Sequence, residues 1–450
     1  MHAGTPQAGT ADTRKVALAS FIGSTLEWYD FFIFGTAAAL VFNTLFFPAA
    51  DPTTGVIASF ATFAVGFVAR PIGGIVFGHY GDRLGRKAML VLSLSMMGGV
   101  TFLIGLLPTY ATLGVWAPVL LTALRFLQGF AVGGEWGGAT LMVVEHAGPK
   151  RRGFYGSWPQ MGIPAALLLS SGVMAAVTGL TSTEEFAAWG WRVPFLLSGV
   201  LLLVGIIIRR RLAESPSFQR LKQTGGREPL PIGTVLSRRK RLTALLIGSQ
   251  AAENTSFYVF AVYSLAYLTT TLGVPRPVVL NALMVAAAAC LVAQPLFGAL
   301  SDRIGRKRVF AGGMVFIGLF IVPFFLLITS RDPVLITVAM VLGLVFGQAT
   351  TQAVQPSLFA EQYEAAIRYS GVSVAYQFAT VLWSGPTPIL AAALWAWSGS
   401  WWPLAGYIVA AALVSVLCIR PLREAAGAAL GAATAEAEES DGVALRGAVA

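Results

Sequence analysis

The chain carries one ten-residue polar segment twice, 220 positions apart, at 78–87 and at 298–307. Both copies read Gly-x-x-x-Asp-Arg-x-Gly-Arg-Lys, and each lies between two long apolar runs. We call them the N-terminal and the C-terminal cassette. A repeat at this separation indicates an internal duplication, and a basic turn between two apolar runs is typical of a loop on the cytoplasmic side of a membrane. The cassettes therefore predict two similar halves built from membrane-spanning helices.

The composition is that of an integral membrane protein. The chain is 56% hydrophobic and 12% charged, with a mean hydropathy of +0.71, whereas a soluble domain is roughly 25% charged. Its two cysteines, Cys290 and Cys418, lie in apolar runs, which argues against a disulfide framework or a metal site. The polar start, Met1 to Asp12, precedes an apolar run longer than the ~7–15 residues of a signal peptide core, so we expect no cleaved signal.

Twelve apolar runs reach the length of about 20 residues that a helix needs to cross a bilayer. They are 16–47, 54–80, 88–108, 113–146, 153–178, 192–212, 242–271, 278–301, 309–330, 334–360, 368–396 and 401–420. The predicted fold class is an all-α membrane protein with 12 transmembrane helices in two pseudo-symmetric six-helix bundles.

The runs divide the chain into five parts. An N-terminal tail (1–15) precedes the first bundle (16–212), a central loop (213–241) leads to the second bundle (242–420), and a C-terminal tail (421–450) follows. The C-terminal tail is rich in Ala, Gly and Glu, and we expect it to be disordered.

Lysine and arginine give the predicted orientation. Of the 31 basic residues, 26 fall in segments that are cytoplasmic if the N-terminus is inside, including ten between Arg209 and Arg241 and also Arg368. Three fall in outside loops (Arg192, Arg276 and Arg331), and two lie within helices. This asymmetry predicts that both termini are cytoplasmic. The net charge of +10 therefore lies in loops near the membrane and does not indicate a nucleic-acid partner.

The duplication extends into the membrane. With an offset of 226 residues, Glu27 aligns with Glu253 and Phe31 with Phe257. At a rise of 1.5 Å per residue, each glutamate lies about 18 Å from its flanking basic residue, near the middle of the bilayer.

Six ionisable residues lie inside apolar runs: Glu27, Asp30, Arg70, Arg125, Glu135 and Glu253. Each costs roughly 2.5–3.5 kcal/mol at a helix centre, so such residues usually face a partner or a water-filled cavity. One interpretation is a structural polar network between helices, and for Arg70 this interpretation is at least as strong as a functional one. The other is a binding site in which carboxylates carry a proton, because no histidine lies inside an apolar run: His79 and His146 lie at helix ends.

The cassettes resemble the loop signature of the major facilitator superfamily. Four further segments resemble its metabolite:proton symporter family, which includes transporters of proline and glycine betaine, 2-oxoglutarate, citrate and shikimate. These segments are 27–31, 125–138, 190–195 and 214–216, and the resemblance spans about 16–420. It implies alternating access to a substrate site near the midplane, between the two halves.

The resemblance also implies that the cassettes close the cytoplasmic side, with Glu145 as a partner for one of their arginines. The expected gate residues are Gly78, Asp82, Arg83, Gly85, Arg86, Lys87, Glu145, Asp302, Arg303, Gly305, Arg306 and Lys307. Ser301 stands where the first cassette has Gly81, which leaves the backbone there less free.

The predicted function is proton-coupled import (symport) of a small carboxylate or zwitterion across the plasma membrane. Arg125 is expected to bind the substrate carboxylate beside Gln128, and the proton candidates are Glu27, Asp30, Glu135 and Glu253. Aromatic side chains could line the site and hold a quaternary ammonium group by cation–π contact: Trp28, Tyr29, Phe31, Phe257 and Tyr258.

Three alternatives remain at this point. A proton-driven efflux transporter would share the fold and the coupling groups, and a transport-inactive sensor would share the fold. An enzyme is disfavoured because the sequence contains no Walker A, HExxH or GxSxG pattern. The expected partners are a small metabolite, protons and lipid, with no cofactor, no metal and no nucleic acid, and we expect the chain to work as a monomer.

Overall fold

The residues described in this computed structural model are 10–48, 52–210, 213–224, 228–428 and 430, and nearly all of them are helical. Nine helical segments within these ranges are long and apolar enough to cross a membrane. They are α4 (Arg86–Leu106), α6 (Trp116–His146), α7–α8 (Pro149–Leu180), α10 (Arg192–Arg210), α16 (Arg276–Ile304), α17 (Arg306–Thr329), α18–α19 (Pro333–Ala360), α20–α21 (Arg368–Ser398) and α22 (Trp402–Ile419).

The three other predicted helices are also present, in less regular form. The first is α1 (Thr10–Ala37) followed by a π-helical turn (Ala38–Phe42) and α2 (Asn43–Phe46), with a bend of 42°. The second is α3 (Pro52–Leu84). The seventh spans 240–271 and is built from α13 (Lys240–Ser249), α14 (Ala251–Phe257), η5 (Tyr258–Tyr263), α15 (Ser264–Ala266) and η6 (Tyr267–Thr271). The predicted all-α fold of twelve spans is confirmed.

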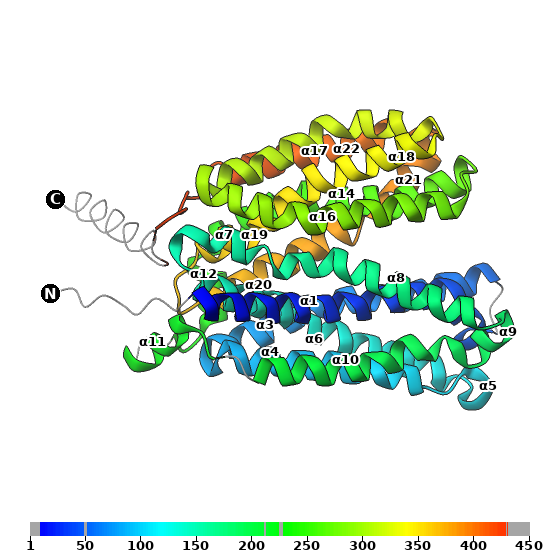
Figure 1. Ribbon diagram of the computed structural model, residues 1–450, viewed down its shortest axis with the longest axis horizontal. Coiled ribbons are helices and arrows are strands. Elements are labelled where there is room, and N and C mark those ends of the chain that lie inside the picture. Colours follow the sequence, from blue (N-terminus) through cyan, green and yellow to red (C-terminus); the bar gives the residue numbers. More distant parts are fainter. Residues whose placement is uncertain (1–9, 49–51, 211–212, 225–227, 429, 431–450) are drawn as a thin grey trace.

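The helices form two groups that lie along each other (Figure 1). α1, α3, α4, α6 and α10 make up one half, while α14, α16, α17, α18, α21 and α22 lie in the other. We call the end that carries both cassettes the cassette end. The short α5 (Tyr110–Leu113) and α9 (Thr183–Glu185) lie at the opposite end (Figure 1).

Each cassette ends in a tight turn between two spanning helices. Gly85 joins α3 to α4 with φ of 120°, and Gly305 joins α16 to α17 with φ of 105°. Only glycine adopts these values without strain, which explains why both copies of the pattern carry a glycine before Arg-Lys.

Glycines bring α3 and α6 into backbone contact. A Cβ on Gly129 would overlap the carbonyl of Gly66, and a Cβ on Gly133 would overlap the carbonyl of Arg70. Small residues that let two backbones approach closely are typical of helix pairs in membranes. This close packing places Arg70 of α3 and Arg125 of α6 beside the same cavity.

Two segments predicted to lie outside the helical bundles contain ordered elements. The predicted central loop 213–241 holds α11 (Pro216–Thr224) and α12 (Pro231–Arg238) at the cassette end (Figure 1). The predicted disordered tail 421–450 begins with a segment packed against the cassette end, where Glu424 accepts hydrogen bonds from the backbone N–H groups of Arg306 (3.0 Å) and Lys307 (2.9 Å). The rest of that tail, 431–450, and residues 1–9 lie outside the described residues.

Candidate functional site

A cavity with about 30 Å³ of water-accessible volume lies between the two halves. The first half contributes Trp28, Arg70 and Ile163 to its lining. The second half contributes mostly polar and aromatic side chains: Glu253, Asn254, Phe257, Tyr258, Gln348, Gln352, Tyr376, Thr380 and Ser384. A ligand here would touch both halves at once, as alternating access requires.

Three π-helical turns shape the second half's side of this cavity. Tyr258 begins η5, Gln348 lies in η7 (Gly343–Ala349), and Thr380 and Ser384 lie in η8 (Thr380–Ser384). Such turns within α-helices are frequently found at functional sites. The seventh, tenth and eleventh spans each contain such a turn at the cavity.

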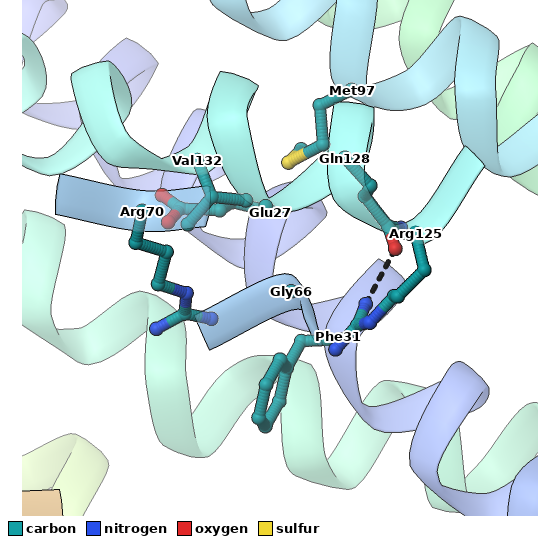
Figure 2. A pocket seen from close by; sticks show the side chains of 9 residues that line it. Glu27, Phe31, Gly66, Arg70, Met97, Arg125, Gln128 and Val132 are labelled. Carbon is teal, nitrogen blue, oxygen red and sulfur yellow. Dashed lines mark hydrogen bonds between the residues drawn. The ribbon is translucent and has the colours of Figure 1, made fainter. Parts of the chain in front are cut away.

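A smaller cavity, with about 10 Å³ of water-accessible volume, lies within the first half (Figure 2). Its lining combines one carboxylate and two guanidinium groups with apolar side chains: Glu27, Phe31, Gly66, Arg70, Met97, Arg125, Gln128, Gly129 and Val132. Arg70 lines both cavities.

Arg125 belongs to a chain of hydrogen bonds. Its Nη1 donates to Gln128 Oε1 at 2.5 Å (Figure 2), Gln128 Nε2 donates to Thr101 Oγ1 at 2.7 Å, and Thr101 Oγ1 donates to Asp30 Oδ2 at 2.8 Å. The guanidinium carbon also lies 4.3 Å from the centre of the Phe34 ring. The structure thus links three predicted site residues, Arg125, Gln128 and Asp30, although Asp30 lines neither cavity.

Glu135 is paired with an arginine that sequence reasoning missed. Arg209 of α10 is buried and forms an ion pair with Glu135, and it also donates to the Leu90 carbonyl at 2.8 Å. Ser93 Oγ donates to the other Glu135 oxygen at 2.7 Å. From the sequence, Arg209 was counted with the cytoplasmic loop because it is the first of a run of basic residues. That assignment was wrong, because the side chain points into the bundle toward Glu135 on α6.

Glu253 lies in a network of amide side chains. Gln355 Nε2 donates to Glu253 Oε2 at 3.1 Å and to Gln250 Oε1 at 2.7 Å. Gln348 Nε2 donates to the Glu253 carbonyl oxygen at 2.8 Å and to Ser256 Oγ at 2.6 Å. The carboxylate of Glu253 therefore accepts from a neutral amide, that of Gln355, and the structure gives it no ion pair among the described residues.

The predicted aromatic residues divide between cavity and core. Trp28, Phe257 and Tyr258 line the larger cavity, and Phe31 lines the smaller one. Tyr29 does not: it is fully buried in the apolar core of the first half, and its hydroxyl donates to the Pro194 carbonyl at 3.0 Å. Adjacent residues on a helix point in directions about 100° apart, so Trp28 and Tyr29 cannot share one face.

At the cassette end, buried charges form two matching clusters. In the first, Arg86 lies 3.3 Å from Asp82 and 3.6 Å from Glu145, and Glu145 accepts from Arg368 of the other half at 2.8 Å. Asp82 also accepts from the backbone N–H groups of Tyr369 and Ser370 at 3.2 and 2.9 Å.

The second cluster repeats this arrangement with the halves exchanged. Arg306 lies 2.7 Å from Asp302 and 3.5 Å from Glu361, and Glu361 lies 3.7 Å from Arg152 of the first half. Asp302 accepts from the backbone N–H groups of Gly153 (2.9 Å) and Phe154 (2.8 Å) at the start of α7 (Arg152–Gly156). In each cluster, a cassette aspartate thus caps a helix of the opposite half.

The other predicted gate residues lie around these clusters. Gly78 packs against the backbone of Ser370. Arg83 and Arg303 are exposed and join neither cluster. Lys87 and Lys307 donate to main-chain carbonyls, Lys87 at 2.8 Å to Arg210 and Lys307 at 2.7 Å to Arg420.

Several cassette-end residues were not found from the sequence. Arg152 and Arg368 were counted only as basic residues of cytoplasmic segments, and Glu361 was given no role. Glu214 lies in the predicted central loop and Glu424 in the predicted C-terminal tail. The duplication relates these residues at a third offset: Arg368 and Glu361 each lie 216 positions after a residue of the other cluster, Arg152 and Glu145, whereas the cassettes are 220 positions apart. Glu361 follows α19 (Thr350–Ala360), outside the spanning segment, and burial raises its pKa to about 7 against the opposing effect of Arg306 and Arg152.

Two known protein families match this chain, one in each half. The family described as "Sugar (and other) transporter" matches residues 16–228, and the family described as "Major Facilitator Superfamily" matches residues 245–439. The two matches therefore cover both halves, and the boundary between them lies near the segment that joins the two helix bundles in the structure.

Similar proteins are bacterial transporters. The chain is 42% identical over 419 residues to the shikimate transporter of Escherichia coli (strain K12), covering 92% of this chain and 95% of that one. It is 43% identical over 387 residues to an inner membrane metabolite transport protein of the same strain, covering 84% and 87%. It is 36% identical over 439 residues to the proline/betaine transporter of Salmonella typhimurium (strain LT2), covering 95% and 86%.

Among solved structures, the proton:xylose symporter XylE bound to 6-bromo-6-deoxy-D-glucose is similar in fold. It matches with a TM-score of 0.74 at 17% identity, covering 94% of this chain and 98% of that chain. The matched families and relatives are transporters rather than enzymes.

Proposed function

The chain belongs to the major facilitator superfamily of transporters, and on that premise we propose that it is a proton-coupled symporter that imports a small hydroxylated carboxylate. The observation that carries this proposal is the cavity that both halves line. It combines a buried guanidinium, a buried carboxylate and a wall of amide and hydroxyl groups, while charged clusters join the halves at one end.

The proton sites in this proposal are carboxylates. Glu27 and Glu253 line the two cavities, and one Glu27 oxygen has no hydrogen-bond partner. Asp30 and Glu135 lie behind the cavity walls, where Thr101 and Arg209 hold them. We assign proton binding first to Glu27 and Glu253, because a carboxyl group that lacks a fixed cation can gain and lose a proton at lower cost.

The lining favours a hydroxylated carboxylate over a quaternary ammonium compound. Asn254, Gln348, Gln352, Thr380 and Ser384 offer hydrogen bonds to hydroxyl groups. Among the relatives, this chemistry matches shikimate better than betaine, and the shikimate transporter is 42% identical against 36% for the proline/betaine transporter.

The proposal places the cassette end in the cytoplasm and the protein in the plasma membrane as a monomer. The distribution of lysine and arginine supports this orientation. In this conformation the two charged clusters act as a closed cytoplasmic gate, and the substrate enters from the opposite end.

Uptake of radiolabelled shikimate, proline and glycine betaine tests the function. In right-side-out vesicles with an imposed inward proton gradient, we expect accumulation of shikimate that an uncoupler abolishes. Proton-driven extrusion of the label would instead establish the efflux alternative, and uptake unaffected by the uncoupler would refute proton coupling.

Arg125→Ala is expected to abolish accumulation while the protein still reaches the membrane at the normal level. The reason is that the variant breaks the chain from Gln128 through Thr101 to Asp30. Membrane abundance is measured by quantitative immunoblot, and normal accumulation in this variant would remove Arg125 from the transport mechanism.

A further inference from the structure

We propose that Arg70, rather than Arg125, binds the carboxylate group of the substrate. This inference rests on the proposed function and names the residue that recognises the charged end of the ligand. The sequence favoured Arg125, and Arg70 was not among the predicted site residues.

The first observation is the position of Arg70. It lies on α3, is only 5% exposed, and lines both the cavity within the first half and the cavity between the halves. Arg125 lines only the smaller cavity, whose walls come entirely from the first half. A substrate held between the halves therefore meets Arg70 first.

The second observation is that no described protein group pairs with the Arg70 guanidinium. Among the described residues, its guanidinium forms no ion pair within 4.0 Å with Glu27, Glu253 or any other carboxylate, and no hydrogen bond to a protein group is recorded for it. By contrast, the Arg125 guanidinium donates to Gln128, and the Arg209 guanidinium is paired with Glu135. Arg70 is therefore the buried arginine near the cavities whose hydrogen-bonding capacity the described protein groups leave for a ligand.

Aromatic rings hold the Arg70 side chain in place. Its guanidinium carbon lies 4.7 Å from the ring centre of Phe67, 5.1 Å from that of Phe31 and 5.9 Å from that of Trp28. Cation–π attraction offsets part of the cost of burying the charge, but aromatic rings do not accept the guanidinium's in-plane hydrogen bonds. A planar fork of N–H donors held this way matches the two oxygens of a carboxylate.

The side chains that the second half contributes to the larger cavity indicate which groups the uncharged end of the ligand carries. Asn254, Tyr258, Gln348 and Gln352 of the second half offer neutral donors and acceptors, and Glu253 already accepts from Gln355. A compact monocarboxylate with hydroxyl groups at its other end satisfies both walls. A dicarboxylate or tricarboxylate would leave an anionic group beside Glu253 without a cation.

A binding measurement on purified protein in lipid nanodiscs tests the assignment. The probes are shikimate and its primary carboxamide, which differ only in the charged group, and binding is followed calorimetrically. We expect the wild type to prefer the acid. Arg70→Gln should lose about 10- to 100-fold in affinity for the acid and little for the amide, because hydrogen bonds to a charged group are worth that factor.

Three further variants sharpen the experiment. Arg70→Lys should recover only part of the acid affinity, since an ammonium cannot bind a carboxylate through two parallel bonds. Arg125→Gln should keep the preference for the acid even though it abolishes accumulation. Arg276→Gln removes an exposed arginine at the start of α16, outside both cavities, and should match the wild type.

The outcomes separate this inference from the proposed function. Amide binding that persists in Arg70→Gln shows that the variant is folded. An acid preference retained by Arg70→Gln, or lost in Arg125→Gln alone, overturns the assignment, as does a wild type that binds acid and amide equally. The preference for the acid could depend on Arg70 while uptake is unaffected by the uncoupler. That combination would support the role of Arg70 in carboxylate binding and would refute only the proton coupling in the proposed function.

Discussion

At the scale of single residues, the fourth position is Gly81 in the first cassette and Ser301 in the second. The residue that each faces in the opposite half differs in the complementary way, large opposite the glycine and small opposite the serine. Gly81 faces Tyr369, whose ring fills the space that a Cβ on Gly81 would need. At the equivalent place in the other cluster, Ser301 faces Gly153, and the Ser301 hydroxyl accepts from Arg306 at 2.8 Å. The glycine in the first cassette thus provides room for Tyr369, whereas the sequence suggested only a freer backbone.

Gly81→Ala is expected to weaken the contact between the halves. Its Cβ would overlap the Tyr369 ring, and overpacking of this kind costs roughly 1–3 kcal/mol. The readout is the rate at which a thiol reagent modifies Ser373→Cys, placed on a buried surface between the halves, in a background without Cys290 and Cys418.

We expect faster modification in Gly81→Ala than in the parent. Gly99→Ala is the matched control, because a Cβ on Gly99 meets nothing within 4 Å. Equal rates in the two variants would contradict the account of Gly81.

Glu361 should make closure at the cassette end depend on pH. In the closed arrangement its pKa is raised from 4.5 to about 7, chiefly by burial, with Arg306 and Arg152 opposing the shift and Glu424 adding to it. Opening would expose the carboxyl group and return its pKa toward 4.5. The contribution of Glu361 to closure is therefore fully present below about pH 4.5 and is lost as the pH rises through about 7.

The Ser373→Cys reporter measures this effect. The ratio of its modification rate to the rate in a Glu361→Gln variant cancels the titration of the thiol itself. We expect the ratio to rise between pH 5.5 and pH 8, and a ratio that stays constant across this range would show that Glu361 does not govern closure.

At the scale of elements, two glutamates, one from the central loop and one from the C-terminal tail, cap the helices that follow the cassettes. Glu214 accepts from the backbone N–H groups of Arg86 (3.2 Å) and Lys87 (3.3 Å) at the start of α4, as Glu424 does at the start of α17. A carboxylate at a helix N-terminus satisfies donors that the helix cannot and is favoured by the helix dipole. The segments after the sixth and twelfth spans are therefore anchored in the same way.

Glu424→Ala should lower thermal stability measurably. Loss of an N-terminal cap costs about 0.5–2 kcal/mol, which corresponds to a decrease of no more than about 2–4 °C in apparent melting temperature for a chain of this size. Fluorescence-detected unfolding in detergent measures it. Glu184→Ala, at an exposed site in α9 at the opposite end, should leave the melting temperature unchanged, and an equal decrease in both variants would remove the capping role.

At the scale of the whole molecule, the duplication produces two charged clusters at the cassette end, and each cluster joins one half to the other. Glu145 of the first half holds Arg368 of the second, and Glu361 of the second holds Arg152 of the first. Each cluster contains charges that are nearly or fully buried. Breaking either one leaves an uncompensated buried charge, which opening of the cassette end can relieve by exposure to water.

Glu145→Gln should speed modification of Ser373→Cys at pH 7.5 by at least about tenfold, because Glu145 is paired with Arg86 and Arg368 and removal of one partner of a buried ion pair costs on the order of 3–5 kcal/mol. Glu361→Gln should not speed modification at this pH, because the uncharged side chain resembles the protonated form of Glu361 that favours closure. A Glu145→Gln variant no faster than the parent would mean that the first cluster does not hold the halves together.

The sequence was sufficient for the fold because apolar runs and basic loops are local properties. All twelve spans and the two bundles follow from run lengths and the repeated cassette. The sequence was not sufficient for Arg209, Arg152 and Arg368, because whether an arginine near a helix end turns inward depends on a carboxylate from another helix. Tyr29 was misplaced for a related reason, since the rotation of its helix about its axis is set by packing against Pro194 and the core.

The contacts between the halves also bear on how the polypeptide can be made. α11 packs on α6 of the first half, α12 packs on α13 and α20 of the second half as well as on α3, and the charged clusters supply further contacts between the halves. We therefore expect the halves to recognise each other without covalent continuity. Two separately translated polypeptides, divided between α11 and α12, should reassemble in one bilayer through these contacts.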